Sequence, residues 1–117
     1  MIRIKRVYRE PSSRDGTRIL VDRVWPRGIS KEQAKLAAWR KDLAPSSSLR
    51  KWFGHDPDKW EAFKERYRKE LSSAEPRKAL KEFAGLSRKK TITLLYGAAD
   101  EKHNQAVVLK EVLEEPA

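Results

Sequence analysis

Two short apolar runs, separated by a long helical segment, constrain the fold of this chain more than any other feature. Residues 19–21 (Ile-Leu-Val) and 91–96 (Thr-Ile-Thr-Leu-Leu-Tyr) have the length and composition of buried β-strands. The helical patterns in residues 29–90 between them provide the crossover that a parallel pair of strands requires. Parallel pairing would bring the carboxyl ends of both strands to one edge of the sheet.

The remaining strand signals are more local. Residues 2–8 alternate between apolar and basic side chains, which favours a strand with one apolar face. Asp15-Gly16 marks a turn, and the second strand is expected over residues 18–24. Because the connection between these two strands holds no helix, they form either an antiparallel pair or two strands joined by a wrapping loop. Residues 37–43 are either a helix end or a short strand, and we favour the strand.

Capping residues and apolar periodicity predict the helices. Residues 30–33 match a capping box, and the apolar residues of segment 60–71 recur at helical spacing. Helices are therefore expected over about 30–36, over a short serine-capped segment ending at Gly54, from Asp56-Pro57 onward, from Pro76 to about residue 90, and over 101–115 with Asp100 as the cap. We predict a small single α/β domain over residues 1–117, with a three- or four-stranded, mostly parallel sheet packed by about four or five helices.

Composition narrows the class of protein. The 117 residues include no cysteine, which excludes disulfides, thiolate metal sites and thiol nucleophiles. No apolar run approaches the length of a membrane span and the first residues lack the apolar core of a signal peptide, so we expect a cytoplasmic protein without membrane contact. The net charge of +10 favours phosphates, nucleic acid or acidic small molecules as partners, although lysines on the outer faces of helices also maintain solubility.

Two segments that follow predicted strands carry the most chemistry. Residues 22–28 follow the second strand, and residues 96–105 follow the third. Ligands of α/β proteins bind beyond the carboxyl ends of the strands, so we expect a site where the two segments meet. The candidate ligand-binding residues are Arg23, Trp25, Arg27, Lys41, Tyr96, Gly97 and Asn104, and the candidate catalytic residues are Asp22, Asp42, Asp100 and His103.

The residue types indicate an anion site. Arginine offers a planar fork of donors that matches phosphate or carboxylate, and Arg27 is the residue hardest to explain by packing. Gly97 precedes a helix N-terminus whose free amides favour an anion, although Asp100 can occupy the same donors. Carboxylates and His103 are groups that transfer protons near neutral pH, and Trp25 and Tyr96 would form walls.

Several of these residues have a structural alternative. Arg23 can pair with Asp22 or Asp42 across the sheet, Trp25 can pack in the core, and His103 can be an exposed polar residue of a first helical turn. His55 fits a helix entry. The two histidines are far apart in sequence, and no dinucleotide, phosphate-loop or serine-hydrolase motif occurs, so neither a metal nor a cofactor is expected.

Four motifs together resemble a known family. They are residues 22–28 (Asp-Arg-Val-Trp-Pro-Arg-Gly), Trp39 with residues 41–46, residues 49–53, and residues 94–100 with 103–106. The combination resembles domain-of-unknown-function family 488, in its YeaO-like branch. The resemblance implies a small bacterial or archaeal cytoplasmic α/β protein and brings no established reaction. Other branches of that family carry cysteine and histidine after the last strand, and the lack of cysteine here means that a thiol mechanism does not transfer.

Two functional hypotheses follow. The first is a site for a small anionic ligand that bears a phosphate or carboxylate group, at the strand-end edge, with or without catalysis. A phosphorylated or nucleotide-like ligand fits the charge best. The alternative is a basic accessory domain whose arginines and lysines contact nucleic-acid phosphates. A protein-interaction domain is a third hypothesis. The sequence leaves the oligomeric state open.

Overall fold

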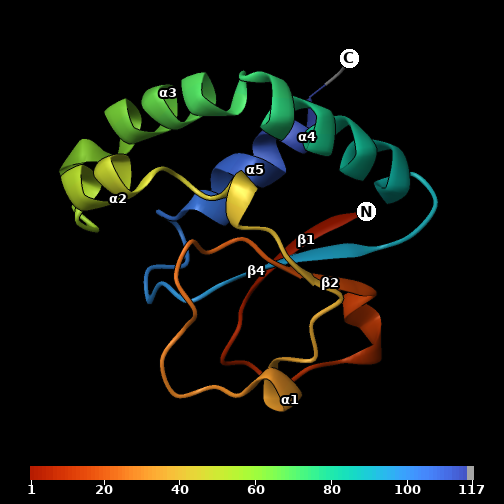
Figure 1. Ribbon diagram of the computed structural model, residues 1–117. Helices are drawn as coiled ribbons and strands as arrows, with labels where there is room; N and C mark the ends of the chain where they lie inside the picture. The colour runs from red at the N-terminus through yellow and green to blue at the C-terminus, as the bar shows by residue number, and fades with distance from the viewer. Residues whose placement is uncertain (116–117) are drawn as a thin grey trace.

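The computed structural model describes residues 1–115 and has a parallel sheet at its centre (Figure 1). The sheet order is β1-β4-β2-β3, with all neighbouring strands parallel. Its strands are β1 (Ile2–Arg6), β2 (Thr17–Leu20), β3 (Ala38–Trp39) and β4 (Ile92–Tyr96). The prediction of an α/β fold with a mostly parallel sheet is confirmed.

Strand β4 lies between β1 and β2, although it is the last strand of the chain. Ile2 is in register with Ile92 on one side, and Ile19 is in register with Leu94 on the other. The first two strands are therefore not an antiparallel pair. They are joined by the wrapping connection of residues 7–16, which includes the short 3-10 helix Ser13–Asp15.

Five α-helices cover the two faces of the sheet unequally (Figure 1). Four lie on one face, and the single-turn helix α1 lies on the other. Their bounds are α1 Lys31–Ala34, α2 Ser47–Phe53, α3 Trp60–Leu71, α4 Ala74–Ser87 and α5 Gln105–Glu114, with further 3-10 helices at Lys41–Leu43 and Pro57–Lys59. None of these helices is long and apolar enough to cross a membrane.

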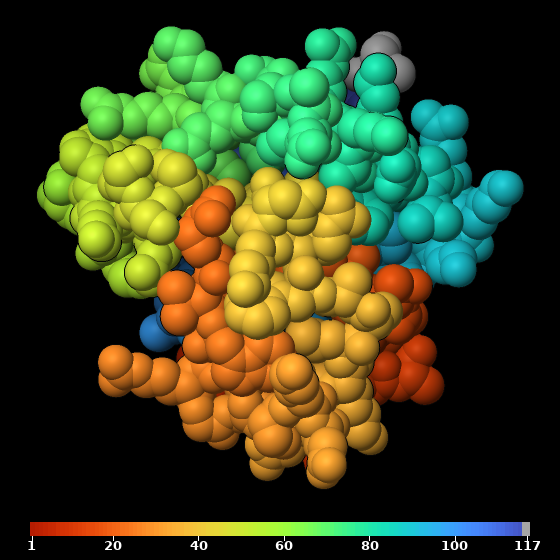
Figure 2. Space-filling model, in the orientation of Figure 1, coloured from red at the N-terminus to blue at the C-terminus, as the bar shows by residue number. Residues whose placement is uncertain are grey.

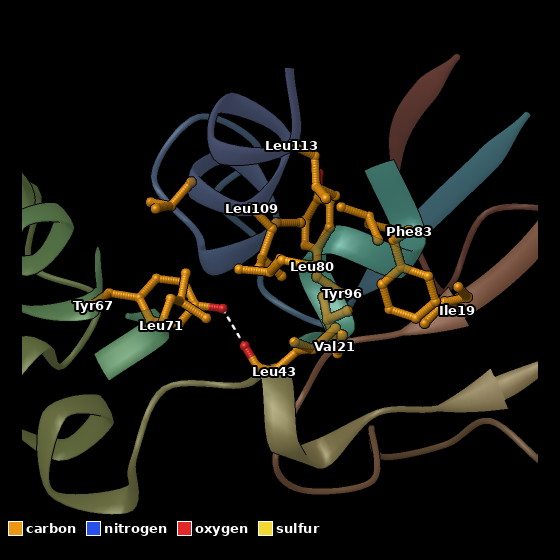
Figure 3. Close-up of a cluster of buried hydrophobic side chains, with 14 of the residues drawn as sticks. Ile19, Val21, Leu43, Tyr67, Leu71, Leu80, Phe83, Tyr96, Leu109 and Leu113 are labelled. Atoms are coloured by element: carbon orange, nitrogen blue, oxygen red, sulfur yellow. Dashed lines mark hydrogen bonds between the residues drawn. The ribbon is translucent and has the colours of Figure 1, made fainter. Parts of the chain in front are cut away.

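The main core lies between the sheet and helices α2 to α5. Alternate residues of β4 point into this core, where Tyr96 lies against leucines of α4 and α5 (Figure 3). The Tyr67 hydroxyl, which is fully buried, donates to the carbonyl oxygen of Leu43 and ties α3 to the segment after β3. This core holds the helices against the strands whose ends carry the candidate site.

Only a thin layer covers the second face of the sheet, and a buried ion pair holds that layer in place. Leu20 and Leu95 form a small apolar cluster there, beneath the segment that contains α1. Arg18, also buried, donates from Nε and Nη2 to the carbonyl oxygen of Ala34 at 3.0 and 2.8 Å, and from Nη1 to the carboxylate of Asp15. The guanidinium thus joins α1 to β2 and satisfies groups that burial would otherwise leave unpaired.

Asp15 in turn connects all three long strands. Its carboxylate accepts from Lys5 of β1 at 3.1 Å and from Arg18 of β2, and its carbonyl oxygen accepts from Thr93 Oγ1 of β4 at 2.7 Å. The next residue, Gly16, has φ +63°, and a Cβ there would lie 2.3 Å from the Thr91 carbonyl oxygen. Only glycine permits the chain to pass so close to β4.

Several predicted boundaries are wrong for identifiable reasons. The second strand ends at Leu20 rather than at residue 24, because the chain leaves the sheet where Asp22 turns toward Gly97. The first strand ends at Arg6, and residues 37–43 form a two-residue strand followed by a 3-10 helix. Helix α1 ends early at Ala34, because Lys35 adopts a left-handed conformation, and α4 begins at Ala74 and ends at Ser87.

Two predicted helix starts also differ. Asp56 caps the 3-10 helix Pro57–Lys59, and α3 follows it. The last helix begins at Gln105 with Asn104 as its cap, because Asp100 closes a separate turn through the amides of Lys102 and His103.

We expect the Asp15→Asn variant to lose roughly 3 kcal/mol of unfolding free energy, since it leaves the buried Arg18 without its counter-charge. Burial raises the pKa of Asp15, but hydrogen bonds from the Ser12 amide, Lys5 and Arg18 outweigh it and lower that pKa. Asp15 therefore adds stability above its ordinary pKa, and that stability is lost as the pH falls through the lowered value. Urea denaturation at pH 7 measures the loss.

The matched control is Asp42→Asn, which breaks the exposed pair of Asp42 with Arg40. That change should cost less than about 1 kcal/mol. Equal losses of unfolding free energy in the two variants would show that the buried pair of Asp15 and Arg18 stabilises the fold no more than an exposed pair does.

Candidate functional site

A cavity of about 640 Å³ opens at the carboxyl ends of β2 and β4. One wall is the segment after β2, a second is the segment after β4, and α2 with its following turn forms a third. Figure 2 shows the orange segment beside the yellow-green α2 region, with blue atoms of the chain near residue 100 between them. The lining residues are Tyr8, Asp22–Arg27, Pro45, Arg50, Phe53, His55, Phe63, Gly97–Asp100 and His103–Gln105.

Asp22 joins the first two walls. Its Oδ2 accepts from the amide of Gly97 at 2.9 Å, and its Oδ1 accepts from the side-chain amide of Gln105. Burial raises the pKa of Asp22 to about 6, even though those two donors and the nearby charges of Arg50 and His55 act to lower it. Asp22 is therefore a carboxyl group that changes charge close to neutral pH inside the cavity.

The glycine after β4 is required by this contact. A Cβ at Gly97 would lie 2.9 Å from Oδ2 of Asp22 and 3.5 Å from Cβ of Pro26. Any larger residue would push the carboxylate away from the Gly97 amide. The role of Gly97 is thus to admit Asp22, and its amide donates to that carboxylate.

Three arginines surround the cavity from different elements. Arg23 donates to the carbonyl oxygens of Pro45 at 2.8 Å and Ala44 at 3.3 Å, so it pairs with neither of the acids considered from the sequence. Arg27 and Arg50 are exposed. Within residues 1–115, none of the three forms an ion pair with a carboxylate.

The turn after β4 holds an aspartate–histidine pair. Oδ2 of Asp100 lies 2.9 Å from Nδ1 of His103, and Oδ1 of Asp100 accepts from the amides of Lys102 and His103. The hydrogen bond from His103 is the main cause that lowers the pKa of Asp100. His103 lies in the turn before α5, not in a first helical turn, and its ring centroid is 5.2 Å from that of Trp60 in an edge-on arrangement.

Asn104 is buried and acts as the cap of α5. Its Oδ1 accepts from the amide of Val107 at 3.1 Å, and its Nδ2 donates to the carbonyl oxygen of Asp100 at 2.9 Å. Both polar ends of the side chain are therefore already used within the fold.

The other residues selected from the sequence lie at or beyond the edge of the cavity. Trp25 lines it, but its Nε1 donates to Ile29 and its ring packs edge-on against Trp39. The side chain of Tyr96 packs in the core (Figure 3). Lys41 covers the Trp39 ring at 4.0 Å and Asp42 pairs with Arg40, and neither lines the cavity.

Four lining residues with polar groups were not selected from the sequence: Tyr8, Arg50, His55 and Gln105. His55 has φ +57°, so the chain turns sharply between α2 and the next 3-10 helix and brings this residue to the cavity. Arg50 on α2 lies in the motif of residues 49–53 that carries the family resemblance, but that motif assigns it no role. No local pattern singles out Tyr8 after β1. Among residues 1–115, no group of three or more histidine and acidic side chains could hold a metal ion.

Comparison of the sequence with known proteins shows the family of this chain. A family model described as the inactive DUF488-N3 subclade matches residues 1–117. The chain belongs to the DUF488 family. It is 42% identical over 112 residues to the uncharacterized protein YeaO of Escherichia coli K12, covering 96% of each chain.

A second relative of this DUF488 chain comes from Mycobacterium tuberculosis H37Rv. The uncharacterized protein Rv3073c is 37% identical over 112 residues, which are 96% of this chain and 92% of the relative. No solved structure matches at a significant level. The family resemblance expected from the four motifs is thereby confirmed.

We expect the Asp22→Asn variant to be more stable than the wild type at pH 7.5. A carboxyl group with a pKa of about 6 when folded and 3.8 when unfolded adds stability below pH 3.8, and that stability is lost as the pH rises through 6. The gain should reach up to roughly 3 kcal/mol, at about 1.4 kcal/mol per pKa unit. Asparagine can accept from Gly97 and donate to a flipped Gln105 amide, so no buried group is left unpaired.

Urea denaturation between pH 4 and pH 8 measures this effect. The variant should show a flatter pH dependence than the wild type. Asp100→Asn is the control of opposite sign, because it removes the partner of His103 and should lower stability at pH 7.5. An unchanged pH profile in Asp22→Asn would contradict the raised pKa.

Proposed function

We propose that this DUF488 chain binds a small anionic ligand, carrying a phosphate or carboxylate group, in the cavity beyond β2 and β4. The observation that carries the proposal is the convergence of Arg23, Arg27 and Arg50 on one cavity without a carboxylate partner among residues 1–115. Unpaired guanidinium groups around a concave, partly apolar surface favour an anion as the missing partner.

The three arginines differ in what they contribute. Arg23 is held by two backbone carbonyl oxygens, so it supplies a positioned positive charge at low cost in conformational entropy. Arg27 and Arg50 have exposed side chains that can close on a ligand. His55, like Arg50, lines the cavity.

A binding role is better supported than a catalytic one. The matched family model is described as inactive, which favours a protein that retains a ligand pocket without a reaction. Asp22, Asp100 and His103 share the cavity, but Asp42 lies elsewhere, and Asp100 is engaged by two amides as well as by His103.

Titration with sodium sulfate in low-salt buffer tests the proposal, since the charge of sulfate is constant between pH 5 and pH 8. We expect saturable binding to one site, measured by calorimetry, and about tenfold weaker binding in Arg27→Ala or Arg50→Ala, the range for a lost hydrogen bond to a charged group. Lys81→Ala, on α4 and outside the cavity, should bind as the wild type does.

The pH dependence of sulfate binding provides a second test of the proposed anion site. Because protonation of Asp22 removes a negative charge from the cavity, affinity should rise as the pH falls from 7.5 to 5.5. The difference in pH dependence between wild type and Asp22→Asn isolates the contribution of Asp22. Absence of saturable binding at low salt, or equal binding in all three alanine variants, would refute the anion site.

A nucleic-acid-binding role is the second candidate, favoured by the outer face of α4. Six basic residues there and just beyond its end are exposed, and none forms an ion pair within the described part of the chain: Arg77, Lys78, Lys81, Arg88, Lys89 and Lys90. Such a face supplies the sequence-independent phosphate contacts of non-specific binding.

Salt dependence separates the two candidates. Binding of a labelled oligonucleotide through several of these phosphate contacts predicts a logarithmic salt slope of about −0.9 per contact on duplex DNA. Lys81→Ala and Lys89→Ala should then reduce that slope, whereas Arg27→Ala should not. A shallow slope, or none of the expected reduction, would exclude this role for α4.

A further inference from the structure

The cavity has an apolar rim as well as its arginines. The large apolar side chains most exposed in residues 1–115 are Met1, Tyr8, Val24 and Leu86, and two of these, Tyr8 and Val24, line the cavity. Tyr8 is 43% exposed and Val24 is 55% exposed. Exposed apolar groups gathered at a concave site indicate that a ligand covers them.

Tyr8 is held rigidly in spite of this exposure. Its hydroxyl donates to the carbonyl oxygen of Arg27 at 2.8 Å, and the Arg6 guanidinium lies over its ring at 5.1 Å. Arg6 is itself anchored by a hydrogen bond from Nε to the carbonyl oxygen of Ala98 at 2.9 Å. The ring therefore spans the two segments that form the cavity and loses little freedom when a ligand packs on it.

The position of the ring next to Arg27 links apolar and ionic recognition. Because the Tyr8 hydroxyl contacts the backbone of Arg27, a ligand lying on the ring is within reach of the Arg27 side chain. Bases stack on aromatic side chains of this kind, and arginine binds the adjoining phosphate. A ligand with only an anionic group would leave the ring uncovered.

The floor of the cavity supplies hydrogen-bonding groups. Asp22 accepts one donor at each carboxylate oxygen, so each oxygen retains acceptor capacity, and Gln105 lies beside it. Amino groups of a base or hydroxyl groups of a ribose match these acceptors. The volume of about 640 Å³ lies within the range of sites for ligands of this size.

We propose that the ligand is a nucleotide, with its base on the Tyr8 ring and its phosphate at Arg27 and Arg50. This inference rests on the proposed function, since it assigns the class of anion that the same cavity takes. The shared chemistry is a nucleoside 5′-phosphate, either free or at the end of a strand.

Calorimetric titration with four probes tests the assignment: sulfate, ribose 5-phosphate, adenosine 5′-monophosphate and adenosine. The nucleotide should bind most tightly, at least about fivefold more tightly than ribose 5-phosphate, as expected for stacking of one base. Equal affinity for these two probes would overturn the nucleotide assignment and leave the anion site intact. Failure of sulfate, ribose 5-phosphate and the nucleotide to bind would refute the proposed function itself.

Substitution of Tyr8 locates the base. Tyr8→Leu should abolish the preference for the nucleotide over ribose 5-phosphate. Because Tyr8→Leu and Tyr8→Phe both lose the hydrogen bond to the carbonyl oxygen of Arg27, the two variants should bind sulfate with equal affinity. Tyr8→Phe keeps the ring and should keep the preference. A preference that survives in Tyr8→Leu would overturn the stacking role.

Two further measurements use the wild-type protein. Saturation-transfer NMR should give the strongest transfer to the adenine protons, and transfer confined to the ribose would overturn the proposal. A 5′-phosphorylated tetranucleotide distinguishes a free nucleotide from the 5′ end of a nucleic-acid strand. Tighter binding than the mononucleotide assigns the site to a strand end, and weaker binding assigns it to the free nucleotide.

Discussion

The buried pair of Arg18 and Asp15 is the contact on which the arrangement of the sheet depends. One face of the sheet is covered by four helices, and ordinary apolar packing accounts for it. The other face has a small apolar cluster and a helix of one turn, which is too little surface to stabilise a layer on its own. Hydrogen bonds from Arg18 to the end of α1, and from Lys5, Arg18 and Thr93 to Asp15, hold that layer in place.

This arrangement has a direct consequence for the cavity. The segment that carries Asp22, Arg23 and Arg27 runs from β2 to α1. The hydrogen bonds of Arg18 to α1 therefore fix both ends of this segment. Asp22 then fastens the segment to the turn after β4 through Gly97. Polar contacts between backbone and side chain thus shape the site, and they leave a half-buried carboxyl group with a raised pKa at the junction.

The sequence predicted the central strands correctly where the apolar pattern of a strand and the length of the connection to it indicate the same arrangement. The run at Ile92–Tyr96 is buried at every position, as expected for a central strand of a parallel sheet that is covered on both faces. From it, and from the crossover length, the meeting of segments 22–28 and 96–104 at one cavity followed. The sequence could not reveal Tyr8 or Arg50, because their places depend on how the β1 exit and α2 pack against those segments.

The chain order of the strands has a consequence for how this protein is made. Because β4 separates β1 from β2, β1 has no sheet partner and β2 has only the two-residue β3 until residues 92–96 have left the ribosome. The nascent chain thus carries unpaired edges of β1 and β2 through most of its synthesis. High contact order of this kind slows folding and exposes apolar segments to aggregation. The net charge of +10 can therefore serve the unfinished chain as much as the finished one, since repulsion between like charges keeps incomplete copies apart.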